Sequence, residues 1–240
     1  MADFACKDEM TILVTGSSRG LGRGLVEYYA ERGWRVFGCS RSESDFIHAR
    51  YHHIVTDISS EEGVRVIFKI LSKDSIKPTV LINNAGIKSN SHALLATLKQ
   101  AEEMISSNFI GAFLIMRETS KLMKRAHFGR IINISSIAVP LADVGSGLYA
   151  ATKAAVEQFS RSLSREFRRD DITVNTLGIS VYQDSAMVRQ LDSDTLARAQ
   201  ENLMKPSALT ISEICHAIDF FASSKARNIS GQTVYFGGVR

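Results

Sequence analysis

Residues 10–22 read Met-Thr-Ile-Leu-Val-Thr-Gly-Ser-Ser-Arg-Gly-Leu-Gly, and this stretch decides the fold. The apolar run that ends at Thr15 is typical of a strand buried on both faces. Its Gly-x-x-x-Gly-x-Gly turn leads towards residues 25–31, which favour a helix that ends at Gly33. Such a turn lets backbone N–H groups and the helix dipole face a phosphate. The stretch therefore predicts a nucleotide-binding unit, although the spacing departs from Gly-x-Gly-x-x-Gly.

The alternation of strands and helices continues along the whole chain. Further strands are expected at residues 34–39, 51–56, 79–82, 131–135, 172–177 and 231–236. Helices are expected at 59–71, 93–125 (as one or two helices), 149–169 and 212–221, the last capped by Ser212, with a loop at 139–147. This order predicts an α/β fold, a single Rossmann-type doubly wound parallel sheet of about seven strands with helices on both faces.

No linker, repeat or low-complexity segment interrupts this pattern. We therefore expect residues 1–240 to form a single dinucleotide-binding and catalytic domain. Within it, residues 1–9 are expected to be an N-terminal tail and residues 181–205 a substrate lid. The loops expected to shape the substrate site are 88–92, 139–144 and 182–205.

The composition argues against several functions. The 240 residues are 45% hydrophobic and 22% charged, as in ordinary globular proteins, and the net charge of +4 implies no nucleic-acid partner. No apolar stretch reaches the ~18 residues of a membrane span, and residues 1–9 do not read as a signal peptide. Three widely spaced cysteines, Cys6, Cys39 and Cys215, indicate reduced thiols in a cytoplasmic protein. No His or Cys spacing predicts a metal site.

Ser136, Tyr149 and Lys153 are the residues around which chemistry is expected. Ser136 follows the expected strand 131–135, and Tyr149 and Lys153, four residues apart, share one helix face. A phenol has a pKa of about 10, and a nearby ammonium lowers it, so this tyrosine could exchange protons near neutral pH. The alternative is chance spacing on an amphipathic helix. The solvated face of that helix would consist of Glu157, Arg161, Arg165, Arg168 and Arg169.

The end of the second expected strand predicts the cofactor. Dinucleotide folds commonly place an acid there for the adenosine ribose, whereas this chain has Ser40-Arg41. A guanidinium binds a 2′-phosphate well, and Arg19 in the glycine turn could help. Each charge-assisted hydrogen bond contributes ~1.5–3 kcal/mol, roughly ten- to a hundredfold in affinity. We therefore predict NADP(H) rather than NAD(H); the alternative is that Arg41 is a solvated surface residue.

From about Thr11 to Gly238 the chain resembles the short-chain dehydrogenase/reductase family, in particular its NADPH-dependent 3-oxoacyl-acyl-carrier-protein reductase-like members. Five motifs in the expected order carry the resemblance. They are Thr15-Gly16-x-x-x-Gly20-x-Gly22, Asn83-Asn84-Ala85-Gly86, Asn108, Ser136 and Tyr149-x-x-x-Lys153.

The resemblance implies a role for each matching residue. Tyr149 would be the general acid in reduction, Lys153 would bind the nicotinamide ribose, and Ser136 would bind the substrate oxygen. Asn108 would hold a water through its backbone; the alternative is an exposed polar position in a helix. The cofactor contacts implied are Gly16, Ser18, Arg19, Gly20, Leu21, Gly22, Ser40, Arg41, Asp57, Ile58, Asn84, Ala85, Gly86, Tyr149, Lys153, Ile179 and Tyr182.

The chain departs from the family pattern in three places. Ile179-Ser180 stands where the family usually has Pro-Gly, which changes the backbone options near the nicotinamide carboxamide. Val139 replaces a common Gly three residues after Ser136 and adds bulk near the substrate. The segment after the second strand is shorter than usual, which would open the adenosine side.

These observations favour an oxidoreductase that transfers a hydride reversibly from NADPH to a carbonyl, with Tyr149 as general acid/base. The substrate would be a small carbonyl compound or alcohol, such as a 3-oxoacyl thioester, a sugar, a pterin or another ketone, either free or bound to a carrier protein. The resemblance also implies a homo-oligomer, a tetramer or dimer. The alternatives are a non-catalytic NADP(H)-binding sensor or scaffold, and isomerisation or dehydration at the same site.

An acidic carrier protein would require a basic face on this chain. The candidate residues for this face are Lys121, Lys124, Arg125, Arg168 and Arg169. The alternative is that these residues form an ordinary solvated surface.

Overall fold

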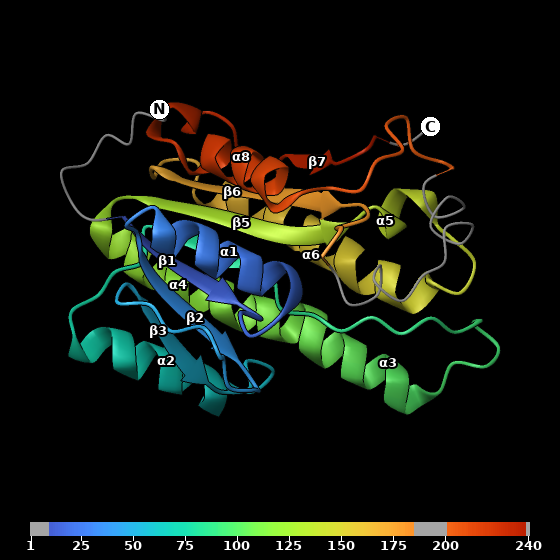
Figure 1. Ribbon diagram of the computed structural model, residues 1–240, viewed down its shortest axis with the longest axis horizontal. Coiled ribbons are helices and arrows are strands. Elements are labelled where there is room, and N and C mark those ends of the chain that lie inside the picture. Colours follow the sequence, from blue (N-terminus) through green and yellow to red (C-terminus); the bar gives the residue numbers. More distant parts are fainter. Residues whose placement is uncertain (1–9, 185–200, 239–240) are drawn as a thin grey trace.

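All strands of the described chain join one parallel sheet (Figure 1). The structure is a computed structural model that describes residues 10–184 and 201–238. The sheet has seven strands in the order β3-β2-β1-β4-β5-β6-β7, and every neighbouring pair is parallel. The strands are β1 (Thr11–Thr15), β2 (Arg35–Ser40), β3 (Tyr51–Val55), β4 (Val80–Asn83), β5 (Gly129–Ser136), β6 (Ile172–Ile179) and β7 (Thr233–Tyr235). The predicted doubly wound α/β sheet is confirmed.

Helices cover both faces of this sheet (Figure 1). Apolar residues of α1 (Gly20–Glu31) and α8 (Ile211–Ala222) form one core layer with Ile12 and Val14. Those of α2 (Glu61–Lys73), α4 (Gly111–Ala126) and α6 (Gly147–Glu166) form the other with Leu13. Alternate residues of β1 thus point to opposite layers, which explains why the whole strand is apolar. Among the described helices, none is long and apolar enough to cross a membrane.

The expected helix at 93–125 is divided into three consecutive segments. They are α3 (Leu98–Met104), the π-helix η1 (Ile105–Ile110) and α4. Thr97 and Gln100 form a capping box that begins α3. Single π-turns inside helices are rare and often mark functional sites, and Asn108 lies in this one.

Two local predictions were wrong. Residues 139–147 are not all loop, because α5 (Ala138–Leu141) includes residues 139–141 and α6 begins at Gly147. Pro140 is tolerated in α5 because the first-turn N–H groups of a helix have no intrahelical partner in any case. Ser212 does not cap α8. The cap is Thr210, whose hydroxyl accepts from Glu213 N at 3.3 Å, while Glu213 Oε2 accepts from Thr210 N at 2.8 Å.

The expected tail at 1–9 and most of the expected lid at 181–205 lie outside the described residues. The two described ends of the lid are tied to other segments. Leu209 N donates to Val181 O at 2.7 Å, and Lys205 N donates to Gly237 O at 2.8 Å. The chain therefore enters and leaves this region from fixed positions beside β6 and β7.

The strand order reverses between β1 and β4, and this reversal positions the site. Chain crossovers run away from this point in both directions, so a crevice forms at the carboxyl ends of the strands. Thr15, Asn83, Ser136 and Ile179 end their strands there. Residues from four distant parts of the sequence therefore meet at one edge.

Gly178 in β6 lies against the ring of Tyr235 in β7, and a side chain there would clash. A Cβ added at Gly178 would lie 2.1 Å from Tyr235 Cδ1, so we predict that Gly178→Ala lowers the free energy of unfolding by about 1–3 kcal/mol. Gly147→Ala is the matched control, because no atom lies within 4 Å of its added Cβ and alanine favours helix. Urea unfolding of both variants tests this; equal stabilities would contradict the close contact.

Candidate active site

The glycine turn between β1 and α1 has the backbone that a phosphate site needs. Gly16 and Gly20 have φ of +71° and +56°, which other residues rarely adopt. A Cβ on Gly22 would lie 2.0 Å from Gly16 O, so the turn can close on the helix only with glycine there. Arg19, the N-cap of α1, makes no side-chain cap hydrogen bond, and the first turn carries no acid. The turn therefore fits a dinucleotide diphosphate, and α1 begins earlier than the sequence indicated.

Thr15 joins this turn to the segment after β4. Its hydroxyl accepts from Asn84 N and Ala85 N, each at 3.0 Å, and donates to Asn83 Oδ1 at 3.2 Å. The Asn84 amide donates back to Thr15 O and Gly16 O at 3.0 and 3.3 Å. The side chain of Asn84 therefore holds the glycine turn in place, a positioning role that its motif did not reveal.

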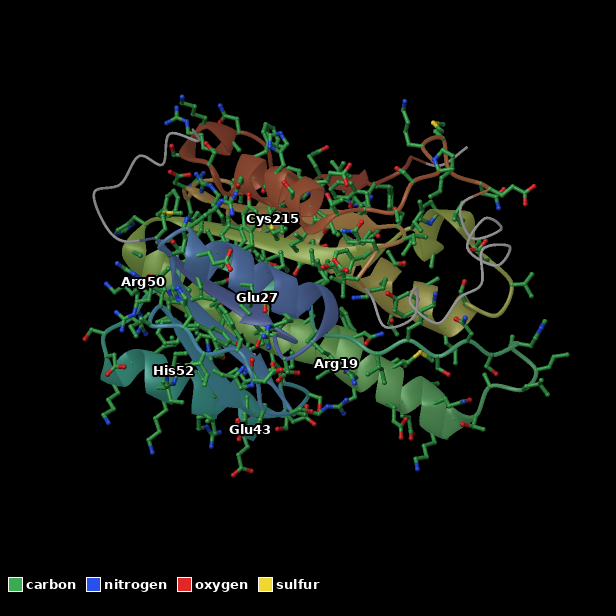
Figure 2. All side chains as sticks on the ribbon, in the orientation of Figure 1. Arg19, Glu27, Glu43, Arg50, His52 and Cys215 are labelled. Atoms are coloured by element: carbon green, nitrogen blue, oxygen red, sulfur yellow. The ribbon has the colours of Figure 1, made fainter. Side chains whose placement is uncertain are left out.

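A cavity of about 530 Å³ lies where the adenosine side was expected. Arg41 and Asp57 line it from the ends of β2 and β3, and Ile87, Glu102, Glu103 and Ser106 line it from the segments after β4. Arg41 and Arg19 are both exposed, and none of the ion pairs among described residues involves either one. Figure 2 shows Arg19 at the turn before α1. Both guanidinium groups are thus free to meet an anion.

The other residues expected on the adenosine side of the cofactor differ in exposure. Ile58 is buried, and its side chain lies against Gly111 of α4, while the Asp57 carboxylate accepts from Ser59 N at 2.9 Å. Ser40 Oγ donates to Ser42 O at 2.7 Å and also contacts His53. The sequence did not indicate the role of His53, which bonds Ser42 and Tyr51 and so fixes the segment that carries Arg41.

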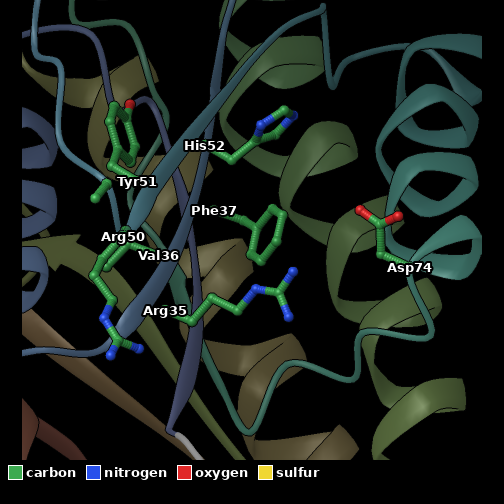
Figure 3. A pocket seen from close by; sticks show the side chains of 8 residues that line it. Arg35, Val36, Phe37, Arg50, Tyr51, His52 and Asp74 are labelled. Carbon is green, nitrogen blue, oxygen red and sulfur yellow. The ribbon is translucent and has the colours of Figure 1, made fainter.

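A second cavity, of about 370 Å³, lies at the opposite, amino-terminal ends of β2 and β3 (Figure 3). Arg35, Phe37 and His52 point from the sheet towards α2 and Asp74. No residue of the expected catalytic or cofactor sets lines it. This cavity is therefore separate from the expected site at the carboxyl edge.

The structure brings the four expected catalytic residues together at that edge. Ser136 ends β5, Tyr149 and Lys153 lie one turn apart on α6, and Asn108 lies in η1. A Cβ on Gly86 would lie 3.1 Å from Asn108 Oδ1 and 3.3 Å from Lys153 Nζ, so the segment after β4 passes directly beside both.

Asn108 is 1% exposed, so the alternative of an exposed helix position is wrong. Its Oδ1 accepts from Ile87 N at 2.7 Å, and its Nδ2 donates to Ile87 O at 2.9 Å and to Thr152 Oγ1 at 3.0 Å. Thr152 in turn donates to Tyr149 O at 2.7 Å. The side chain of Asn108 therefore couples the segment after β4 to the helix that carries Tyr149.

Burial dominates the acid–base properties of the pair on α6. It raises the pKa of Tyr149, against a smaller lowering by the Ser136 hydroxyl. Burial also lowers the pKa of Lys153 to about 8, and Glu157 opposes this. Lys153 Nζ donates to Ile134 O at 2.9 Å and lies 6.0 Å from the Tyr149 ring centre. The expectation that Lys153 lowers the Tyr149 pKa is thus not met in this geometry, because desolvation raises that pKa and only the Ser136 hydroxyl opposes it.

Glu157 was expected on a solvated face, and that prediction was wrong. It is 5% exposed, and its carboxylate accepts from Ser135 Oγ at 2.5 Å and from Tyr235 OH at 2.6 Å. It follows Lys153 by four residues, the same spacing that joins Tyr149 to Lys153, so one helix face carries all three. That spacing places Glu157 on the face of Lys153, but it does not by itself show that the face is buried there.

The remaining expected cofactor contacts occupy mixed positions. Ile179 and Tyr182 are buried in the core layer of α1 and α8, and Leu21 packs against the same layer. Ser18 is half-buried in the glycine turn. With Ile179 in place of proline, β6 continues to that residue, and Ile137 N donates to Ile179 O at 3.0 Å. Ile179 is thus paired with Ser136 in the register of β5 and β6.

Comparisons with known proteins agree with this geometry. A family model described as short chain dehydrogenase matches residues 10–196. The chain belongs to the short-chain dehydrogenase family. It is an oxidoreductase of that family, with a fold that binds a nicotinamide cofactor. Within the described residues, no group of three or more His, Cys, Asp or Glu could hold a metal ion.

Individual relatives resemble the chain over nearly its whole length. The 3-oxoacyl-[acyl-carrier-protein] reductase FabG of Escherichia coli (strain K12) is 31% identical over 234 residues, covering 94% of this chain and 95% of that protein. A short-chain dehydrogenase from Leptospira borgpetersenii with bound NAD⁺ is 25% identical with a TM-score of 0.85, covering 95% and 91%. ElxO with NADP bound, at 23% identity, TM-score 0.86 and coverage of 95% and 97%, shares the fold. Both cofactors occur on this fold.

Burial of Lys153 predicts a measurable pH dependence of stability. Its pKa is about 8 in the folded protein and near 10.5 when unfolded, so the unfolded chain binds more protons between these values. The unfolding free energy should therefore rise with pH in this window, by about 2 kcal/mol from pH 7 to 10, relative to Lys153→Met. Urea unfolding of both proteins at each pH tests this. A constant difference would contradict the depressed pKa, and Lys153→Arg provides a reference that does not titrate.

Proposed function

We propose that this protein reduces a carbonyl group to an alcohol, reversibly, with hydride supplied by NADPH. The observation that carries the proposal is Lys153, buried one turn from Tyr149, with Ser136 at the adjoining strand end. When bound, the cofactor supplies the hydride chemistry, and the protein supplies orientation and the proton.

Each residue of the set has a distinct part in this proposal. Ser136 Oγ donates a hydrogen bond to the substrate oxygen, and Tyr149 OH delivers a proton to the same oxygen. The Tyr149 phenol, whose pKa burial raises, is protonated at neutral pH, as a group that donates a proton must be. Lys153 is positioned to bind the ribose of the cofactor and stabilise the phenolate that proton transfer leaves. Asn108 positions α6 through Thr152.

Tyr149→Phe tests the proton donor. The substitution removes the hydroxyl but keeps the ring, so we expect carbonyl-dependent NADPH oxidation to fall by at least about 100-fold while NADPH binding persists. Steady-state absorbance and fluorescence titration measure the two properties. Full activity of the variant would contradict the mechanism. NADPH binding by the native protein without turnover in a carbonyl screen would support the non-catalytic sensor instead.

Preference for NADP(H) rests on Arg41, which lines the expected adenosine cavity, and on Arg19 in the glycine turn; both are exposed and make no ion pair with described residues. An Arg41→Ala variant should bind NADPH about tenfold more weakly and NADH almost unchanged, because only NADPH carries the 2′-phosphate. Arg65→Ala, on the exposed side of α2, is the matched control. Paired fluorescence titrations decide this, and equal NADPH and NADH affinities of the native protein would refute the preference.

A 3-oxoacyl group on a carrier protein is one candidate substrate, because FabG is named for that activity. The expected basic face gives only limited support to a substrate bound to a carrier protein. Lys121 pairs with Glu118 at 2.7 Å and Lys124 with Asp170 at 3.6 Å, so part of its charge is compensated. A free small molecule is therefore the substrate that we favour.

Three further parts of the proposal concern the whole molecule. We propose a single domain, since every described strand joins one sheet. We propose a homo-oligomer, since Ile105 and Ile110 beside Asn108, and Phe220 and Val234, are exposed. A cytoplasmic location is consistent with the free thiols of Cys39 and Cys215.

A further inference from the structure

A second lysine reaches the proposed proton donor. Lys88 Nζ lies 5.6 Å from the centre of the Tyr149 ring, while Lys153 Nζ lies 6.0 Å from it. Lys153 comes from α6, whereas Lys88 comes from the segment after β4 that passes beside Asn108. The reaction proposed above uses Lys153 and gives Lys88 no part.

The backbone around Lys88 is held by the active site itself. Ile87, its neighbour, exchanges two hydrogen bonds with the Asn108 side chain, at 2.7 and 2.9 Å. Farther along, Ser91 N donates to Gly145 O at 2.9 Å and joins this segment to the turn before α6. Both ends of the segment are therefore fixed to elements that carry Asn108 and Tyr149, which gives Lys88 a defined position over the site.

The charge of Lys88 is only partly compensated. The Lys88 side chain is exposed, and its partial desolvation beside Tyr149 lowers its pKa, which Asp143 opposes from the turn before α6. No ion pair within 4.0 Å joins Lys88 to another described residue. An exposed ammonium that lies beside the proposed proton donor and pairs with no described acid can meet an anionic group of a ligand there.

We propose that Lys88 binds a carboxylate of the substrate, and that the substrate is an oxo acid whose carboxylate lies close to its carbonyl group. This inference rests on the proposed function, because Tyr149 must meet the carbonyl oxygen while Lys88 meets the acid. A monoanion matches the site better than a phosphate dianion, since Lys88 is a single cation and Asp143 lies near it.

Two other roles for Lys88 would act through the tyrosine alone. One is a cation–π contact with the Tyr149 ring, and the other is electrostatic stabilisation of its phenolate. Either would affect every substrate of the enzyme to a similar extent. Binding of a substrate carboxylate affects acids but not their neutral esters, so the two kinds of role can be separated.

The test compares kcat/KM for 3-oxobutanoate and pyruvate with kcat/KM for their methyl esters. Loss of a charge-assisted hydrogen bond should make Lys88→Met lower the value for the acids about ten- to a hundredfold more than for the esters. Lys88→Arg should retain most of the preference for acids. Lys69→Met, on the exposed side of α2, is the matched control and should change neither.

An equal loss for acids and esters would overturn the inference in favour of an effect on Tyr149, and no loss would overturn it outright.

If the native protein reduces none of these compounds, the proposed function fails for this class. Lys88 is then tested by calorimetric binding of malonate to the native protein and Lys88→Met. Weaker binding by the variant supports carboxylate recognition, and equal binding contradicts it.

Discussion

The arrangement of this site depends on keeping one ammonium group, that of Lys153, away from water. Burial of a charge is costly unless hydrogen bonds and an opposite charge compensate it. Ile134 O accepts one hydrogen bond from Lys153, and Glu157 lies one helical turn farther along α6. The Glu157 carboxylate is itself held by Ser135 in β5 and Tyr235 in β7. The position of the lysine therefore requires α6, β5 and β7 to pack in this one arrangement.

A second network fixes the other side of the same site. Asn108 in the π-turn bonds both backbone groups of Ile87 and reaches α6 through Thr152. The glycine turn is joined to the segment after β4 through Thr15 and Asn84. Cofactor turn, segment after β4 and catalytic helix are thus connected by hydrogen bonds of buried or half-buried side chains, which restricts independent movement of any one of them.

Most of the fold could be predicted because its signals are local. Apolar runs such as Ile12–Val14 show a buried strand directly, and a glycine turn followed by a helix identifies the phosphate end. The proposed catalytic set was predicted from spacing and resemblance, and the structure places Tyr149 and Lys153 on one helix face as that spacing requires. The burial of Glu157 was not predictable in this way, because it depends on Ser135 and on Tyr235, a residue far along the chain. The pKa direction of Tyr149 was missed for the same reason, since desolvation is a property of the assembled site.

The account is tested most directly by the pKa of Lys153, measured by NMR of isotope-labelled lysine side chains across a pH titration. The Lys153→Arg variant identifies the signal by its absence. The account predicts a pKa of about 8 in the native protein and a lower value in Glu157→Gln, where the opposing carboxylate is lost. A pKa near the ordinary 10.5 would contradict the burial of this ammonium. A pKa that Glu157→Gln leaves unchanged would contradict its control by Glu157.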